Sequence, residues 1–182
     1  YIFVRKNKVV IWITGISGAG KTTLGSYFFK NLKKKKSNSI FLDGDETRKI
    51  FFGHGKYSLS DRDLHAIKLT NLVKYLSDQN INIIISANIT SQKYRNWCKK
   101  NIKFFLEVFI DASLDELLKR DYKKLYYLAL KKKIKNVVGV DIPFKKPINP
   151  HLVIKNSTSK KNLFKNILKI NKEIKKRKLK IF

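Results

Sequence analysis

The glycine-rich stretch at residues 15–22, GISGAGKT, constrains the fold more than any other part of this chain. It follows an apolar run that begins at Val9, and it fits the pattern G-x-x-x-x-G-K-[ST] at every fixed position. Glycines allow backbone N–H groups to turn inward around phosphate oxygens, and a helix that begins near Lys21 adds its positive end. A chance glycine turn would not account for three glycines in six positions of a chain with only 8. The stretch therefore predicts a strand, a phosphate-binding loop and a helix in succession.

Apolar runs alternate with helix-like segments along the chain, which is typical of a parallel α/β sheet. The runs are short and almost uniformly apolar, as expected of strands buried on both faces. We expect strands at residues 9–14, 39–42, 81–86, 104–110 and 151–154, and helices at 21–34, 61–79, 91–100 and 113–120. The prediction is a single domain over residues 1–182, a three-layer α/β/α sandwich of the P-loop NTPase type with a five-stranded parallel sheet.

Two basic segments complete the expected domain. Residues 121–150 hold a lysine run and all three prolines, which indicates a mobile lid that returns to the last strand. Residues 158–180 carry apolar side chains at roughly helical spacing among many lysines, which predicts an amphipathic closing helix.

The charge balance is extreme, because 41 Lys and Arg residues face 13 Asp and Glu residues and give a formal net charge of +28. Such a surface attracts polyanions, so a nucleic-acid-binding ATPase is one alternative. The lysines are spread evenly, as a compositional drift of the source genome would produce, and no base-reading motif is evident. Nucleic acid is therefore not the expected partner.

The composition also bears on the compartment. No apolar stretch approaches the ~20 residues that a membrane-spanning helix needs. The basic and apolar start of the chain fits a strand feeding the glycine loop better than a signal peptide. The single cysteine, Cys98, excludes an internal disulfide and is compatible with a reducing compartment. We expect a cytoplasmic protein without a membrane partner, in which Cys98 has a packing role.

The glycine loop is expected to hold a nucleoside triphosphate together with Mg²⁺. The Lys21 ammonium would reach the β- and γ-phosphates, and the Thr22 hydroxyl would ligate the metal ion. Further ATP contacts are expected from the other loop residues: Gly15, Ser17, Gly18, Ala19, Gly20 and Thr23. ATP and Mg²⁺ are therefore the predicted cofactors.

The second expected strand ends in FLDGDETR, which places the carboxylates of Asp43 and Asp45 at the carboxyl end of a strand. This is where α/β proteins place their chemistry. One carboxylate can act as a general base or metal-associated group while the other orients it or the acceptor. Arg48, about one helical turn further, suits an anionic acceptor. Taken alone, the stretch could equally be a turn with solvated acids.

In combination, these motifs resemble those of the adenylylsulfate kinases, which transfer the γ-phosphate of ATP to the 3′-hydroxyl of adenylyl sulfate. That family couples a G-[LI]-S-G-[AS]-G-K-[ST] loop to L-D-G-D-x-x-R, and both patterns stand here, at residues 15–22 and 42–48. YSLSDR at residues 57–62 is similar to the family's F-S-x-x-D-R, and residues 105–154 are similar to its strand, helix and lid. The resemblance covers roughly residues 8–170.

The resemblance implies roles for the residues that match. Asp43 and Asp45 would lie beside the acceptor hydroxyl and, with Lys21, carry the catalysis. The acceptor would be held by side chains of both lid and core: Arg48, Tyr57, Arg62 and Lys135. Arg120 would serve ATP from the lid, and the resemblance suggests a homodimer.

Departures from the family pattern cluster on the acceptor side. His65 replaces an asparagine that looks like a nucleotide contact; it could still donate a hydrogen bond to the acceptor, or be an ordinary helix residue. The family's S-P-Y-R is missing, and Ser86, Asn88 and Arg95 are possible substitutes. Val137 stands where the family's lid supplies an aromatic side chain over the acceptor base.

The last departure affects the choice of acceptor, because stacking on one aromatic face contributes about 1–3 kcal/mol per base. A purine loses more than a pyrimidine when one face is missing. Such departures resemble a branch of the family, found with surface-polysaccharide pathways, that phosphorylates cytidine diphosphoramidate. The overall motif set favours adenylyl sulfate as the acceptor, with cytidine diphosphoramidate as the alternative. A catalytically inactive nucleotide-binding module is a further alternative.

Overall fold

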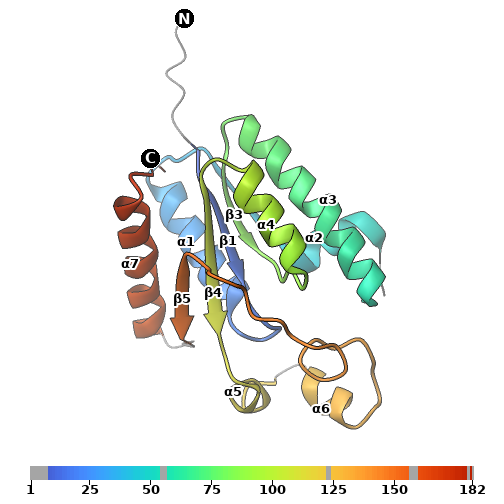
Figure 1. Ribbon diagram of the computed structural model, residues 1–182. Helices are drawn as coiled ribbons and strands as arrows, with labels where there is room; N and C mark the ends of the chain where they lie inside the picture. Colours follow the sequence, from blue (N-terminus) through green and yellow to red (C-terminus); the bar gives the residue numbers. More distant parts are fainter. Residues whose placement is uncertain (1–7, 54–56, 122–123, 156–159, 180, 182) are drawn as a thin grey trace, which may run out of the picture.

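The computed structural model describes residues 8–53, 57–121, 124–155, 160–179 and 181. Its centre is a parallel sheet in the order β2-β3-β1-β4-β5 (Figure 1). The strands are β1 (Val10–Thr14), β2 (Ser39–Asp43), β3 (Asn82–Ser86), β4 (Phe105–Asp111) and β5 (Leu152–Lys155). Every expected strand is present, with each end within one residue of its predicted position. The predicted α/β fold is confirmed.

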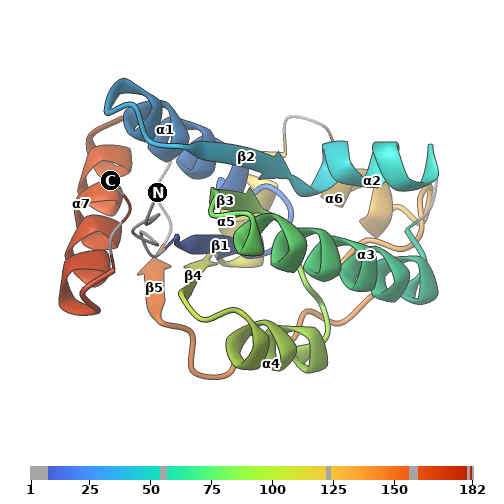
Figure 2. The ribbon, with the colours of Figure 1, turned by 90° about the horizontal axis from the view of Figure 1, so that it is seen from above.

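Helices cover both faces of this sheet, as the view from above shows (Figure 2). The covering helices are α1 (Lys21–Lys34) and α7 (Lys160–Lys176) on one face and α3 (Leu59–Asp78) and α4 (Gln92–Asn101) on the other. Side chains alternate along β1, so that Ile11 and Ile13 pack toward α1 and α7. Val10 and Trp12 pack toward α3 and α4. Because both faces are buried, the strand sequences are apolar throughout.

Several expectations about the helices need correction. α2 (Gly44–Phe52) and α6 (Leu125–Leu130) were not predicted, and α5 (Leu114–Leu118) is shorter than the predicted helix at 113–120. α2 begins without a connecting loop, because Asp43 ends β2 and is also the N-cap of the helix. α7 lies within the predicted range 158–180, of which residues 158, 159 and 180 fall outside the described residues.

The predicted lid lies beyond the carboxyl ends of the strands and contains α6 (Figure 1). Its base is attached to the phosphate-binding loop, because the Tyr126 hydroxyl donates a 2.7 Å hydrogen bond to the Ser17 carbonyl. Gly139 has φ 96° and lies so close to Ile16 that a Cβ there would collide with that side chain. Asp141 closes the same turn by accepting from the backbone N–H of Val137 at 2.6 Å. The lid therefore packs directly on the loop.

Two compositional expectations can be compared with the structure. Cys98 is buried in the core, as a packing role requires. Burial and the neighbouring Glu107 raise the pKa of its thiol to about 12, which disfavours the reactive thiolate. Within the described ranges, no helix has the length and apolar character needed to cross a membrane.

Candidate active site

The phosphate-binding loop turns between β1 and α1 on glycines that need their conformations. Gly18 has φ 75° and Gly20 has φ 94°, in the region that side-chain-bearing residues rarely adopt. Gly20 is the N-cap of α1, so the helix begins at Lys21 with its amino end facing the loop. This arrangement presents backbone N–H groups and the positive end of the helix dipole to an anion.

Lys21 is held inside this loop. Its Nζ donates a 2.9 Å hydrogen bond to the carbonyl oxygen of Ile16. Burial lowers the pKa of Lys21 to about 8, against the opposing attraction of Asp45 and Asp43. The ammonium is therefore positioned at the loop and close to both carboxylates before any phosphate arrives.

Asp43 joins the loop to the acidic end of β2. Its Oδ2 accepts a 2.6 Å hydrogen bond from the Thr22 hydroxyl, and its Oδ1 caps α2 by accepting from the backbone N–H of Asp45 at 2.9 Å. The intervening Gly44 is needed for close packing, because a Cβ there would lie 2.8 Å from the Cβ of Ala87. In the sequence pattern D-G-D, the first carboxylate caps α2, the glycine lets the backbone pass close to Ala87, and the second carboxylate lies on the first turn of α2.

The residues around Thr22 fit the predicted magnesium ion. The Thr22 hydroxyl and the Asp43 carboxylate supply oxygen atoms, which are the ligands that Mg²⁺ prefers. Among the described residues, no group of three or more His, Cys, Asp or Glu side chains could hold a metal by itself. Mg²⁺ is usually bound through one or two protein oxygens together with the phosphates of a nucleotide.

The structure brings together three of the predicted acceptor residues. The guanidinium carbon of Arg48 lies 5.2 Å from the ring centre of Tyr57, and that of Arg62 lies 5.8 Å from it. Arg62 also donates to the Tyr57 carbonyl at 3.0 Å and, across to the lid, to the Asn136 carbonyl at 2.7 Å. Two cations and one aromatic ring therefore form a cluster suited to an anionic, ring-bearing ligand.

His65 lies beneath this cluster, not on its surface, since only 3% of the residue is exposed. Its Nδ1 is 3.0 Å from Nη2 of Arg48, and its Nε2 is 3.2 Å from the hydroxyl of Thr47. Burial, followed by the charges of Arg48 and Arg62, lowers the pKa of His65 to about 4. The side chain is thus neutral and engaged by protein partners.

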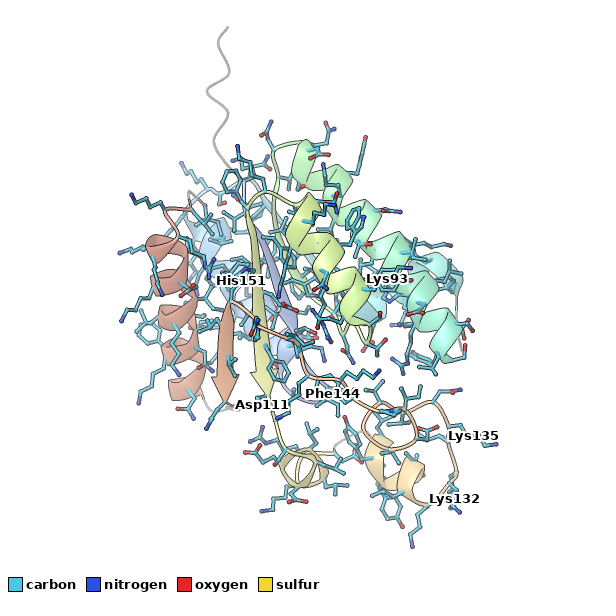
Figure 3. The ribbon with its side chains drawn as sticks, viewed as in Figure 1. Lys93, Asp111, Lys132, Lys135, Phe144 and His151 are labelled. Atoms are coloured by element: carbon cyan, nitrogen blue, oxygen red, sulfur yellow. The ribbon has the colours of Figure 1, made fainter. Side chains whose placement is uncertain are left out.

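The remaining predicted residues have other surroundings. Asn88 is half-buried after β3, and its Oδ1 is buried without a hydrogen-bond partner among the described residues. Lys135 is exposed on the outer side of the lid (Figure 3). Arg120 is half-buried in the turn after α5. Ser86 donates to the Lys21 carbonyl at 2.9 Å and so supports the loop.

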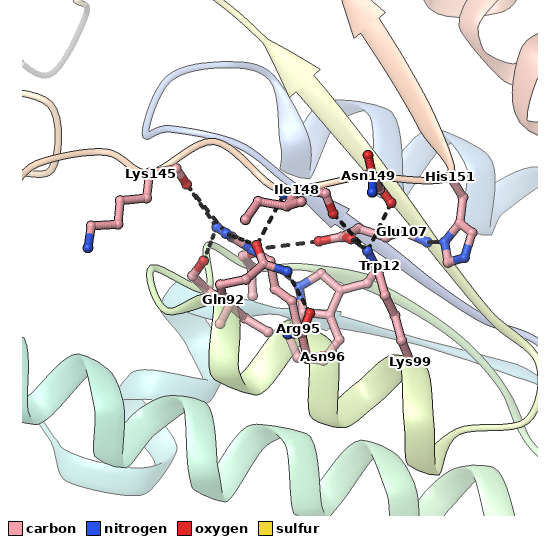
Figure 4. Close-up of polar contacts among 12 residues, drawn as sticks. Trp12, Gln92, Arg95, Asn96, Lys99, Glu107, Lys145, Ile148, Asn149 and His151 are labelled. Atoms are coloured by element: carbon pink, nitrogen blue, oxygen red, sulfur yellow. Dashed lines mark hydrogen bonds and ion pairs between the residues drawn. The ribbon is translucent and has the colours of Figure 1, made fainter.

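Arg95 was interpreted as a possible acceptor contact, and its surroundings correct that interpretation. It is 2% exposed, and its Nε lies 3.6 Å from a carboxylate oxygen of Glu107. Lys99 binds the other oxygen of Glu107 at 2.9 Å and donates to the carbonyl of Asn149 (Figure 4). Arg95 also donates to the carbonyl of Lys145. These side chains anchor the return of the lid to β5.

Val137 was expected to face the acceptor base in place of an aromatic side chain. It is 5% exposed and packs in the core that includes Ile16 and Tyr126. Val137 therefore faces the interior of the protein. The sequence did not predict the contact of Tyr126 with the phosphate-binding loop, or that of Asp141 with the turn at Val137. Gly139, two residues from Val137, was the available signal for this tight turn.

Three comparisons with known proteins bear on this site. A family model described as adenylylsulphate kinase matches residues 7–155. A cytidine diphosphoramidate kinase of Campylobacter jejuni is 42% identical over 154 residues, covering 85% of this chain and 89% of the relative. A probable adenylyl-sulfate kinase of Archaeoglobus fulgidus is 36% identical over 145 residues, covering 80% of this chain and 94% of the relative.

The fold leads to the same group of proteins. The structure of the Mycobacterium tuberculosis APS kinase in complex with AMPPNP and APS aligns with a TM-score of 0.84 at 25% identity. That alignment covers 93% of this chain and 98% of the other. With its phosphate-binding loop, its paired acids and these relatives, the chain belongs to the adenylylsulfate kinase family of nucleotide-binding P-loop kinases.

Proposed function

We propose that this protein transfers the γ-phosphate of ATP to the 3′-hydroxyl of an activated nucleotide, and that the acceptor is cytidine diphosphoramidate. The observation that carries the reaction type is the 2.6 Å contact between Thr22 and Asp43, which joins the triphosphate loop to the acids of β2. The Arg48, Tyr57 and Arg62 cluster lies on the same α2–α3 side of the site. A donor and an acceptor nucleotide can therefore meet at Asp43.

Two observations favour the cytidine compound over adenylyl sulfate. The relative named for it is 42% identical to this chain, whereas the Archaeoglobus adenylyl-sulfate kinase is 36% identical. Val137 itself faces the core, and none of the lid residues 134–139 is aromatic, so Tyr57 is the aromatic side chain that this cluster offers to a base. This reverses the order that the motifs alone favoured. Adenylyl sulfate remains the second candidate because the motifs of its kinases are present.

In the proposed mechanism, positioning and charge neutralisation supply most of the rate, as is general for phosphoryl transfer. Lys21 neutralises charge on the β- and γ-phosphates, and Asp43 accepts or orients the proton of the acceptor hydroxyl. Arg48 and Arg62 bind the anionic group of the acceptor. Mg²⁺, when bound near Thr22, neutralises further phosphate charge. Arg62 contacts the lid at Asn136, which would keep water from the transferred group.

Turnover with the two acceptors tests this proposal. With MgATP, we expect kcat/KM for cytidine diphosphoramidate to exceed that for adenylyl sulfate by about tenfold or more. Stacking on one aromatic face contributes about 1–3 kcal/mol, and a purine loses more than a pyrimidine when that face is missing. ADP release measures the rate, and phosphorus NMR identifies the 3′-phosphate product. A preference for adenylyl sulfate would restore that compound as the acceptor. No turnover of either compound above a Lys21→Ala control would contradict the kinase assignment.

The lowered pKa of Lys21 predicts a pH dependence of ATP use. The free enzyme carries the Lys21 charge below its pKa of about 8 and loses it above, so kcat/KM for ATP should be constant below that pH. Above it, kcat/KM should fall by about tenfold per pH unit, because this parameter reports ionisations of the free enzyme. Lys21→Arg cannot titrate in this range and should give a lower but flat profile. A wild-type profile that stays flat to about pH 10 would contradict this assignment.

A further inference from the structure

Each hydrogen bond of the His65 ring can be assigned a donor and an acceptor. A guanidinium group can only donate, so the Nη2 of Arg48 must donate to Nδ1 of His65 at 3.0 Å. Nδ1 therefore carries a lone pair, and in the neutral ring the proton lies on Nε2. Nε2 then donates to the Thr47 hydroxyl at 3.2 Å, and that hydroxyl donates to the Gly44 carbonyl at 3.2 Å. The chain of donors runs from Arg48 through His65 to the start of α2.

The surroundings of His65 keep the ring in this state. The rings of Phe51 and Phe52 lie edge-on to it, with centroids 5.9 and 6.2 Å away. Arg48 and Arg62 oppose a positive charge on the ring, and burial does so more strongly. A protonated imidazole would have no lone pair to offer Arg48. A neutral acceptor is therefore what this packing requires.

Arg48 is itself held by its neighbours. It is 7% exposed, its Nη2 donates to His65, and its guanidinium carbon lies 5.2 Å from the centre of the Tyr57 ring. A buried hydrogen bond to a charged group fixes geometry as well as adding stability. Side chains that are locked before the ligand arrives lose less entropy on binding.

We propose that His65 is a positioning residue, a hydrogen-bond acceptor that fixes the guanidinium of Arg48 for the anionic group of the acceptor nucleotide. This inference rests on the proposed function, in which Arg48 contacts that group. His65 does not touch the nucleotide; it acts through Arg48. This role differs from the direct contact with the nucleotide that the position of His65 in the sequence suggested.

Paired substitutions separate the two hydrogen bonds of the ring. In His65→Asn the amide oxygen can occupy the place of Nδ1 and still accept from Arg48. In His65→Gln the longer side chain reaches toward Thr47 and removes the acceptor that Nδ1 of His65 offers to Arg48. We expect His65→Gln to raise the acceptor KM roughly ten- to hundredfold, the worth of a hydrogen bond to a charged group. His65→Asn should stay within about threefold of wild type, and the ATP KM should change little in both.

His151 offers a matched control. Its ring is half-buried, its Nδ1 accepts from the backbone N–H of Glu107 at 2.8 Å, and its pKa, like that of His65, is lowered to about 4, mainly by burial. It lies immediately before β5, beside Glu107 and its ion pairs (Figure 4), and the donor to its Nδ1 is a backbone N–H and not Arg48. His151→Gln should therefore leave the acceptor KM unchanged. Equal acceptor KM values for His65→Asn and His65→Gln, or a wild-type value for His65→Gln, would overturn the proposal.

A readout that does not need turnover distinguishes this proposal from the proposed function. Nitrogen NMR of the imidazoles should show His65 as the neutral Nε2–H form at pH 7, assigned through His65→Asn among the 3 histidines of the chain. Arg48→Leu should change the Nδ1 shift of His65 and not that of His151. If the wild type phosphorylates neither acceptor while these shifts hold, the function fails and the His65–Arg48 link stands. An Nδ1–H tautomer would overturn the positioning role whatever the activity.

Discussion

Replacing Asp43 with asparagine should lower kcat by roughly a hundredfold or more, the contribution typical of a positioned general base. Asparagine retains one oxygen that can cap α2, and its amide NH₂ can donate to the Thr22 hydroxyl, so the fold and the loop should persist. What it removes is the negative charge and the basicity beside the acceptor hydroxyl. Steady-state kinetics with both substrates varied should show the loss in kcat, with the ATP KM within about threefold of wild type.

Asp45→Asn is the matched comparison, because Asp45 is exposed on the first turn of α2 and caps nothing. Its charge favours the charged forms of Lys21 and Arg48, so its loss should weaken binding more than chemistry. An undiminished kcat in Asp43→Asn would remove Asp43 from the catalytic role. A larger kcat loss in Asp45→Asn would assign the proton to the second carboxylate instead.

Replacing Glu107 with glutamine should lower the free energy of unfolding by about 3–5 kcal/mol, the usual effect of breaking a buried ion pair. Glu107 is 1% exposed and pairs with Arg95, which is 2% exposed, and with Lys99. The neutral amide would leave the Arg95 charge buried without its counter-ion. Urea denaturation followed by circular dichroism measures the loss as a lower midpoint.

An exposed ion pair provides the control for this prediction. Lys74 and Asp78 form a 2.5 Å pair at the end of α3, with more than half of the Asp78 side chain exposed. Asp78→Asn should change the free energy of unfolding by less than about 1 kcal/mol. Equal losses in the two variants would mean that burial contributes nothing to the Glu107 cluster.

The sheet could be predicted because its information is local. Each strand is a short apolar run with both faces buried, and the helix at Lys21–Lys34 follows directly from the glycine loop. The nearness of the glycine loop to the acids of β2 was expected, since the carboxyl ends of parallel strands lie at one edge of a sheet, but the hydrogen bond between Thr22 and Asp43, across the end of β3, was not predicted. α2 was missed because Asp43 is both the last strand residue and the helix cap.

The acceptor side could be predicted only in part, because its contacts join distant segments. Arg48, Tyr57 and Arg62 were expected together and lie together. The burial of His65 depends on the packing of α2 against α3, which single positions in the sequence do not reveal. Arg95, on α4, shows the same limit, since its partner Glu107 lies on β4 and its carbonyl partner at Lys145 belongs to the lid.

The attachment of Tyr126 to Ser17 and of Gly139 to Ile16 has a consequence for engineering. A segment exchanged between this kinase and a relative, in order to alter acceptor choice, brings its own contacts to the glycine loop. A chimera that imports residues 121–150 alone would place a foreign surface on Ile16 and Ser17. Productive exchange therefore requires co-transfer of the matching loop positions, so that the two inserts are chosen as a pair.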